Sequence, residues 1–197
     1  MKTFMNTQKM NYKKKIRKFL YENEIARVLD LCCHTKYPDR NKTLILFTYN
    51  HAFRAGEVCG LKWSQIDFTN NQINIISQKG GVDCTHLLEK GEIEPLMKLY
   101  ENRNKDLPYV FTSERNAKFE PQNFYRLLLK LGKMARFDFV LTPHMLRHSK
   151  GTFLANNDVN IFKIKAFLRH KRISSTELYI HMAANQFKNI NDGSIFS

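Results

Sequence analysis

Two short extended segments interrupt a chain whose apolar residues otherwise follow helical spacing, and this interruption most constrains the fold. Residues 72–77 alternate apolar and polar side chains, and residues 82–88 form a second extended stretch. Between them lie Lys79, Gly80 and Gly81, and glycine supplies the backbone freedom that a hairpin turn requires. The sequence therefore predicts an antiparallel hairpin with Lys79 at the end of its first strand or on its turn.

Helical spacing is present on both sides of this hairpin. Apolar residues recur at helical intervals from Ile25, and residues 42–53 predict a largely buried helix that residues 54–61 continue as a short one. After the hairpin, helices are predicted over residues 91–102 and from Pro121, where a proline precedes an apolar stripe. A chain of 197 residues without internal repeats favours one domain.

The charge balance indicates an anionic partner. Lysine and arginine number 32 against 18 acidic residues, a net charge of +14, and nucleic acid is the commonest partner of such a protein. A basic but solvated surface is the alternative. Residues 1–18 form a basic arm in which Lys13, Lys14 and Lys15 are predicted to bind DNA phosphates, unless the arm stays disordered.

Other classes of protein are disfavoured. No apolar run approaches eighteen residues, and the basic N-terminus lacks the apolar stretch of a signal peptide, so no membrane partner is expected. The four cysteines show neither zinc spacing nor a disulfide framework, so no metal site is predicted. A reducing, cytoplasmic setting follows.

The segment from residue 142 to 179 concentrates groups that phosphate chemistry uses. Thr142 and Pro143 predict a helix start, which places His144 and Arg147 on one face of the first turn. Backbone amides at such a helix start favour a bound anion. Tyr179 falls in the second turn of a later helix.

Two cap predictions accompany this segment. Asn160 is expected to cap the next helix, at whose end His170 lies. The pair Ser174 and Glu177 has the spacing of a capping box, which would start the helix that carries Tyr179.

Six side chains could act together on a phosphodiester if the fold brings them together. Two arginines would bind non-bridging oxygens, a tyrosine would attack phosphorus, the histidines would serve as base or donors, and a lysine would protonate the departing oxygen. Each also has a structural interpretation; Arg54, for example, could form an ordinary helix ion pair with Glu57. The six candidates are Arg54, Lys79, His144, Arg147, His170 and Tyr179.

The order and spacing of these residues resemble the tyrosine recombinase (phage integrase) family over roughly residues 20–190. Tyr179 follows His170 by nine residues, as in the family. The other matching motifs are Phe53-Arg54-Ala55-Gly56-Glu57-Val58, Lys79-Gly80, His144-Met145-Leu146-Arg147-His148-Ser149 and Leu168-Arg169-His170.

One branch of the family is especially similar, the Fim-type recombinases. They invert a promoter-bearing DNA element that switches fimbrial expression in enterobacteria. The motifs that carry this likeness, besides the short length, are Thr85-His86-Leu87-Leu88, Pro143 to Ser149 and Leu154-Ala155-Asn156.

The resemblance implies an α+β fold, mainly helical with a small antiparallel sheet, and a reaction without metal, ATP or other cofactor. Tyr179 would form a 3′-phosphotyrosine, Arg54 and Arg147 would clamp the phosphate, and Lys79 would be the general acid. His144 and His170 would complete the pocket. Glu57 would orient an arginine and His148 would be structural.

The resemblance also implies partners and organisation. Residues 19–197 would be a catalytic domain without a separate core-binding domain, acting as a homotetramer on two duplex DNA sites with inverted repeats, with accessory DNA-bending proteins. Residues 182–197 would either reach into a neighbouring protomer or form a frayed tail. The setting would be the bacterial cytoplasm, at the nucleoid.

Two residues depart from the family pattern, and two alternative functions stay open. Arg169 replaces a glycine before His170, and Lys150 replaces something smaller; both are predicted to contact DNA. The same chemistry could integrate or excise a mobile element. Alternatively, the chain could be a catalytically silent DNA-binding regulator.

Overall fold

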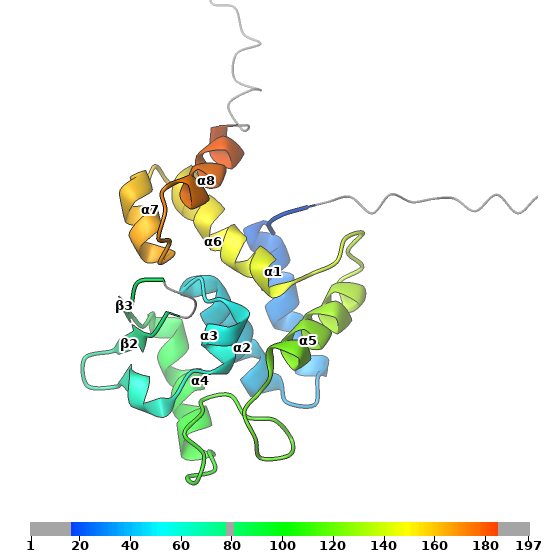
Figure 1. Cartoon of the computed structure of the whole chain (residues 1–197). Helices are drawn as coiled ribbons and strands as arrows, with labels where there is room; N and C mark the ends of the chain where they lie inside the picture. The colour runs from blue at the N-terminus through cyan, green and yellow to red at the C-terminus, as the bar shows by residue number, and fades with distance from the viewer. Residues whose placement is uncertain (1–16, 78–80, 185–197) are drawn as a thin grey trace, which may run out of the picture.

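The computed structural model describes residues 17–77 and 81–184 (Figure 1). Helices dominate the described part of the chain and a small sheet lies on one side of it (Figure 1). In chain order the elements are α1 (Glu22–Asp30), the 3₁₀ turn η1 (Leu31–His34), α2 (Pro38–Asn50), α3 (Ala55–Cys59), the 3₁₀ turn η2 (Trp63–Gln65), β1 (Ile66–Asp67), β2 (Gln72–Ile75), β3 (Cys84–Leu87), α4 (Lys90–Glu101), α5 (Pro121–Met134), α6 (Pro143–Asn156), α7 (Ile161–Phe167) and α8 (Ser174–Ala184).

Helix α2 lies at the centre of the main core. Its buried residues include Leu44, Ile45 and Phe47, and it packs against α1, α3, α4 and α6. The prediction of a buried helix here is confirmed, but α2 begins at Pro38, whose ring suits the first helical position. It stops at Asn50 because the chain turns through Ala52, which has a φ of 48°.

The predicted hairpin is present as part of a three-stranded antiparallel sheet in the order β1-β2-β3. In β2, Ile73 and Ile75 are buried, so one face of the sheet packs on the core. Ile73 pairs with His86 and Ile75 with Cys84. Both strands are shorter than predicted, and β1 was not predicted because two residues cannot show an alternating pattern.

The three C-terminal helices of the described chain pack together at one end of the molecule (Figure 1). They enclose a second, smaller apolar cluster that includes Ile164, Leu168 and Tyr179. Pro143 starts α6 as predicted. The Asn160 cap is also confirmed, because its side chain accepts a 2.9 Å hydrogen bond from the Phe162 amide.

The predicted capping box at Ser174 is wrong by one residue. Helix α8 begins at Ser174 itself, and the carbonyl of Ile173 accepts the amides of Thr176 and Glu177 at 2.7 and 3.2 Å. The backbone carbonyl of Ile173 therefore accepts the first amides of α8, where the sequence predicted the side chain of Ser174 as the acceptor.

The described residues begin inside the predicted basic arm. The Arg17 guanidinium donates two hydrogen bonds of 2.7 and 2.6 Å to the carboxylate of Glu24 and lies 4.5 Å from the Tyr21 ring centroid. The amide of Leu20 donates to the Ser149 hydroxyl at 2.8 Å. Arg17 is thus committed to the protein, whereas Lys13, Lys14 and Lys15 lie outside the described residues.

The predicted fold class, mainly helical with a small antiparallel sheet, is confirmed. None of the helices within residues 17–77 and 81–184 has the length and apolar character that crossing a bilayer would require.

Candidate active site

Tyr179 is the most deeply buried of the predicted catalytic residues that the structure describes. Only 1% of it is exposed, and it packs in the cluster that contains Leu168. Its hydroxyl lies 2.8 Å from Nδ1 of His148. Burial raises the pKa of Tyr179, and the charges of Arg147 and Arg54 oppose this effect only partly. The hydroxyl is therefore protonated at neutral pH and positioned to donate to the imidazole.

His148 is in a form that can accept this hydrogen bond. Burial, followed by the charges of His144 and Arg147, lowers its pKa to about 4. A neutral imidazole has one nitrogen without a proton, and Nδ1 serves as the acceptor here. The sequence predicted a structural role for His148; the structure makes it the direct partner of Tyr179.

Gly151 permits the close approach of α6 and α8. A Cβ atom at this position would lie 2.5 Å from Cε1 of Tyr179, well inside van der Waals contact. Sequence reasoning missed this residue. The available signal was a glycine inside a helix, which costs about 1 kcal/mol relative to alanine and often marks a close approach.

His170 also lies next to the tyrosine ring. The two rings are nearly parallel, at 13°, with centroids 6.3 Å apart. Nδ1 of His170 lies 2.9 Å from the Thr176 hydroxyl oxygen. Burial, followed by the charges of Arg147 and Arg54, lowers its pKa to about 4. His170 is therefore neutral at physiological pH, with its ring fixed against Tyr179.

His144 lies at the edge of this arrangement. It is exposed, and its ring centroid is 6.4 Å from that of His148. Both His144 and Arg147 lie in the first part of α6 as predicted, but their exposure differs, because Arg147 is only 4% exposed.

Arg54 and Glu57 form the predicted ion pair, with a different local geometry. Arg54 is the N-cap residue of α3 rather than a member of a continuing helix. Its Nη1 donates to Oε1 of Glu57 at 2.6 Å, and its backbone amide donates to Oε2 at 2.9 Å. Nη1 is also 3.5 Å from the hydroxyl of Ser77, so the end of the first hairpin strand lies against Arg54.

Arg147 is held by the backbone of two distant segments. Its two terminal nitrogens donate to the carbonyls of Ala52 and Leu168. Burial lowers the pKa of Arg147, and the like charges of Arg169 and Arg54 act in the same direction. The guanidinium is therefore fixed in place by two neutral carbonyl oxygens, and neither of them balances its positive charge.

Arg169 is buried, so the predicted DNA contact is wrong. It is 1% exposed, and its guanidinium donates to the carbonyls of His51 and Ala52 at 3.0 and 2.8 Å and to Oε2 of Glu57 at 3.1 Å. Its φ of 57° explains the glycine expected here, because a left-handed backbone costs an L-residue about 1–2 kcal/mol.

Lys150 is also buried, so its predicted DNA contact is wrong too. It is 9% exposed, and its ammonium lies 5.4 Å from the Tyr49 ring centroid, 5.3 Å from that of Phe153 and 4.0 Å from Oε1 of Glu89. The prediction failed because α6 is covered on nearly all sides, so this face of the helix points at aromatic rings instead of solvent.

The site carries an excess of positive charge. The Glu57 carboxylate forms ion pairs with the guanidiniums of Arg54 and Arg169, and the guanidinium of Arg147 lies near enough to feel its charge. Burial alone would raise the pKa of Glu57, but Arg169 and Arg54 outweigh it and the pKa is lowered, so the carboxylate stays ionised. One negative charge cannot balance three positive ones, and a phosphate bound beside Tyr179 would supply the missing charge.

Lys79 lies outside the described residues, so its predicted place in the site stays a prediction. Among residues 17–77 and 81–184, no three metal-ligating side chains gather as a metal site requires.

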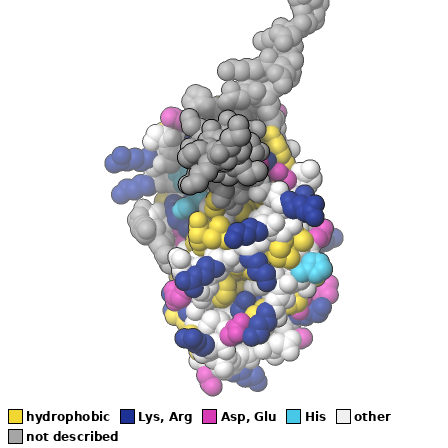
Figure 2. Space-filling model, turned by 90° about the vertical axis from the view of Figure 1, so that its right-hand side faces the viewer, with side chains coloured by type: hydrophobic (Ala, Val, Ile, Leu, Met, Phe, Trp, Pro, Cys, Tyr) yellow, Lys and Arg dark blue, Asp and Glu magenta, His cyan; other side chains and the backbone are white. Residues whose placement is uncertain are grey.

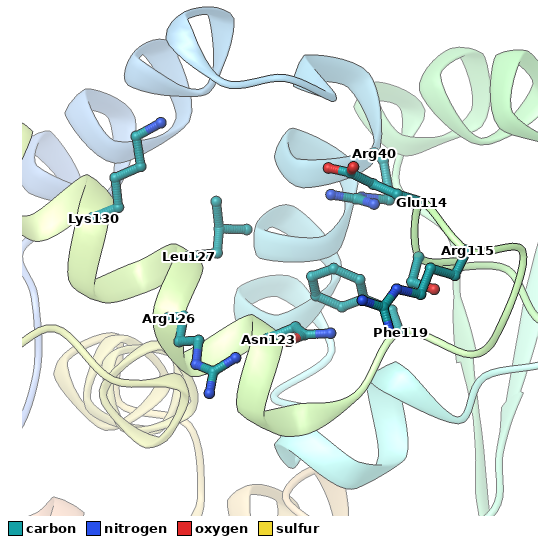
Figure 3. Close-up of a pocket in the computed structure, with 9 residues that line it drawn as sticks. Arg40, Glu114, Arg115, Phe119, Asn123, Arg126, Leu127 and Lys130 are labelled. Carbon is teal, nitrogen blue, oxygen red and sulfur yellow. The ribbon is translucent and has the colours of Figure 1, made fainter.

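A basic pocket elsewhere takes no part in this arrangement. It has a volume of about 620 Å³ and lies between α2, α5 and the loop before α5 (Figure 3). None of the candidate active-site residues lines it. Its charged lining residues are Arg40, Glu114, Arg115, Arg126 and Lys130.

Comparison with known proteins gives a family match over most of the chain. The family described as the phage integrase family matches residues 18–186, which include every candidate residue from Arg54 to Tyr179. The type 1 fimbriae regulatory protein FimB of Escherichia coli K12 is 33% identical over 182 residues, covering 90% of this chain and 91% of FimB.

Longer relatives match over part of their length. The tyrosine recombinase XerA of Pyrococcus furiosus is 29% identical over 178 residues, which cover 89% of this chain and 61% of XerA. A crystal structure of XerA recombinase superposes with a TM-score of 0.77 at 26% identity, covering 90% of this chain and 66% of that one. A XerH site-specific recombinase bound to a palindromic difH substrate superposes with a TM-score of 0.75 at 20% identity, covering 89% and 53% respectively, and shows likeness of fold.

Proposed function

Since the chain belongs to the phage integrase family of tyrosine recombinases, we propose that it is a site-specific DNA recombinase that cleaves and rejoins DNA through a 3′-phosphotyrosine at Tyr179. One observation carries the proposal: the Tyr179 hydroxyl, bonded to His148, belongs to a site with more guanidiniums than carboxylates. A phosphodiester is an anion that suits such a site.

The proposed cleavage step conserves one phosphoester bond. Tyr179 attacks the scissile phosphorus, its proton passes to Nδ1 of His148, and the bond from phosphorus to the 5′ oxygen breaks. Lys79, on sequence grounds, gives the departing oxygen its proton. A 5′ hydroxyl of a partner strand then gives its proton to Lys79, attacks the phosphotyrosine and releases the tyrosine, which takes its proton back from His148.

The other side chains stabilise charge. Arg54 and Arg147 are proposed to bind the non-bridging oxygens, whose negative charge grows in the transition state. His144 and His170 complete the pocket, and Glu57 orients Arg54 through two hydrogen bonds. Tyr179 is 1% exposed, so a phosphate can reach its hydroxyl only after α8 or its surroundings move.

We further propose that the reaction is inversion of a promoter-bearing DNA element controlling fimbrial expression. Support comes from the similarity to a type 1 fimbriae regulatory protein over nearly the full length of both chains. The proposed assembly is four protomers on two inverted-repeat sites. In it, residues 1–18 would contact DNA, accessory proteins would bend it, and residues 182–197 would reach a neighbour.

A nicked suicide DNA substrate provides the test. DNA from inverted repeats flanking the gene is incubated with the protein, and a covalent adduct is sought by denaturing gel electrophoresis. We expect wild type to form the adduct and Tyr179→Phe to form none. Adduct formation by the Phe variant, or its absence with wild type, would refute the phosphotyrosine mechanism.

A second measurement separates the three functions. In cells that carry an invertible reporter, inversion predicts both orientations of the element with wild type and one with Tyr179→Phe. Loss or gain of the element would indicate excision or integration. If the Phe variant preserved every cellular effect, the chain would be a silent DNA-binding regulator.

A further inference from the structure

Arg169 connects Arg54 and Arg147, the two arginines of the proposed phosphate clamp, although the family pattern has a glycine at this position. It shares Glu57 with Arg54, because the carboxylate accepts Arg54 Nη1 at 2.6 Å and Arg169 Nη2 at 3.1 Å. It shares the carbonyl of Ala52 with Arg147, at 2.8 Å from Arg169 and 2.5 Å from Arg147. Among the described arginines, no other one is hydrogen-bonded both to an acceptor of Arg54 and to an acceptor of Arg147.

Several specific contacts hold the Arg169 side chain in its position. Its side chain is fully buried, with Cζ 5.6 Å from the Phe53 ring centroid and a further 3.0 Å hydrogen bond to the carbonyl of His51. The residue holds a left-handed backbone, with a φ of 57°, to make these contacts. A side chain that only filled space would need neither the guanidinium nor this set of four acceptors, which also includes the Phe167 carbonyl at 3.1 Å.

We propose that Arg169 is a positioning residue for DNA cleavage, which fixes Glu57 and the 51–52 turn so that Arg54 and Arg147 are held ready for the phosphate. The inference rests on the proposed function. Arg169 does not touch the phosphate; it acts through the carboxylate and the carbonyl that it shares with the two clamp residues.

Arg169 also favours the ionised form of Glu57. The charged groups that face this carboxylate are Arg54 at the N-cap of α3, Arg147 on α6 and Arg169 after α7, and Cys84 on β3 is the nearby thiol. Among the influences that lower the pKa of Glu57, Arg169 is the largest. Removing Arg169 should therefore make the carboxylate easier to protonate, and a protonated Glu57 holds Arg54 less firmly.

The test compares Arg169→Gly with Arg169→Lys. Glycine suits the left-handed backbone but lacks the guanidinium, whereas lysine keeps the charge and loses the planar fork. In single-turnover cleavage of the nicked substrate we expect Arg169→Gly to be slower by about tenfold or more, as for other misplaced catalytic groups. Its acid limb of rate against pH should shift to higher pH, and Arg169→Lys should recover part of the rate.

Glu57→Gln provides the control background. There, Arg169→Gly should slow cleavage much less than in wild type, because the shared acceptor has lost its charge. Thermal unfolding of each variant checks that it is folded. Equal rates and pH profiles in wild type and Arg169→Gly would overturn the inference while leaving the recombinase proposal intact.

A measurement without DNA keeps the two proposals separable. The pKa of Glu57 is followed by carbon-detected NMR of side-chain-labelled glutamate in the full chain. We expect the Glu57 pKa to be higher in Arg169→Gly than in wild type, with Arg169→Lys between them. An unchanged pKa would overturn the inference whether or not wild type forms an adduct.

Discussion

Gly151 and Tyr179 fit together so closely that their residue types cannot be chosen independently. The tyrosine ring occupies the space where any side chain at position 151 would begin. Glycine weakens a helix, yet the position allows α6 and α8 to approach and brings the Tyr179 hydroxyl to His148. The hydrogen bond between Tyr179 and His148 therefore depends on the absence of a methyl group at position 151.

Replacing Gly151 with alanine tests this fit. The new Cβ would lie 2.5 Å from the ring, so Tyr179 or α8 must shift. We expect the free energy of unfolding to fall by about 1–3 kcal/mol, as in other overpacked cores, in spite of the better helix propensity of alanine. Chemical denaturation measures this, and the adduct assay should show a slower reaction.

Gly91→Ala is the matched control for this variant. Gly91 lies in α4, and a Cβ there would meet no atom within 4 Å. The same substitution should leave adduct formation unchanged and raise stability by roughly 0.4–1 kcal/mol. If Gly151→Ala behaved like Gly91→Ala, the steric account of the α6–α8 contact would be wrong.

Among the elements, α6 connects the site to the segment that precedes α1. Its Arg147 and His148 face the site, while its Ser149 hydroxyl accepts the Leu20 amide at 2.8 Å and donates to the Met145 carbonyl at 2.7 Å. The segment that precedes α1 is thereby fixed to the helix that carries the site.

Ser149→Ala should release this N-terminal segment. The buried Leu20 amide would lose its acceptor, which costs about 1 kcal/mol in unfolding free energy. Hydrogen exchange of the Leu20 amide should quicken, while exposed Ser175 on α8 gives a control variant, Ser175→Ala, with no such change. Unaltered exchange at Leu20 in Ser149→Ala would contradict the tether.

The sequence predicted most elements and misplaced particular side chains, for physical reasons. Periodicity revealed α5 and the hairpin because each buries one face, and the apolar run at residues 42–53 revealed the buried helix α2. The sequence could not show that α6 is covered on nearly all sides, so Lys150 was placed on the surface. Nor could it show the left-handed backbone at Arg169, which depends on contacts with residues more than a hundred positions away.

Motif order indicated four residues that the structure places close together, whereas the contacts within the site were not predictable. Arg54 and Arg147 lie near enough to His170 and Tyr179 for their charges to act on the pKa values of both. The bond from Tyr179 to His148 depends on how α6 and α8 cross, and local sequence does not encode a crossing angle.

Over the whole molecule, burial of neutral histidines should make the protein sensitive to acid. Burial lowers the pKa of His86 to about 3, and those of His148 and His170 to about 4, from an ordinary value of 6.5. The unfolded chain therefore binds protons more tightly than the folded one. The stabilisation is complete above about pH 6.5 and is lost as the pH falls towards 4.

The expected result is a lower free energy of unfolding at pH 5 than at pH 7, by at least about 2 kcal/mol. Urea titrations at the two pH values measure it. His86→Phe should reduce the difference, since the ring packs in parallel on Phe167 with centroids 4.3 Å apart. His34→Gln, at an exposed position, should keep the whole difference; equal stabilities at both pH values in wild type would contradict the prediction.

The contacts of Arg169 also say when the protein can first become active. Glu57 is synthesised before its partner Arg169, which lies 112 positions later in the chain, and Tyr179 is synthesised after both. A nascent chain that still lacks α7 and α8 has neither the nucleophile nor the residue that joins the two clamp arginines. On the proposed function, a DNA-cutting protein is thus inert on the ribosome until α8 emerges, and a fragment that ends before Arg169 cannot break a chromosome.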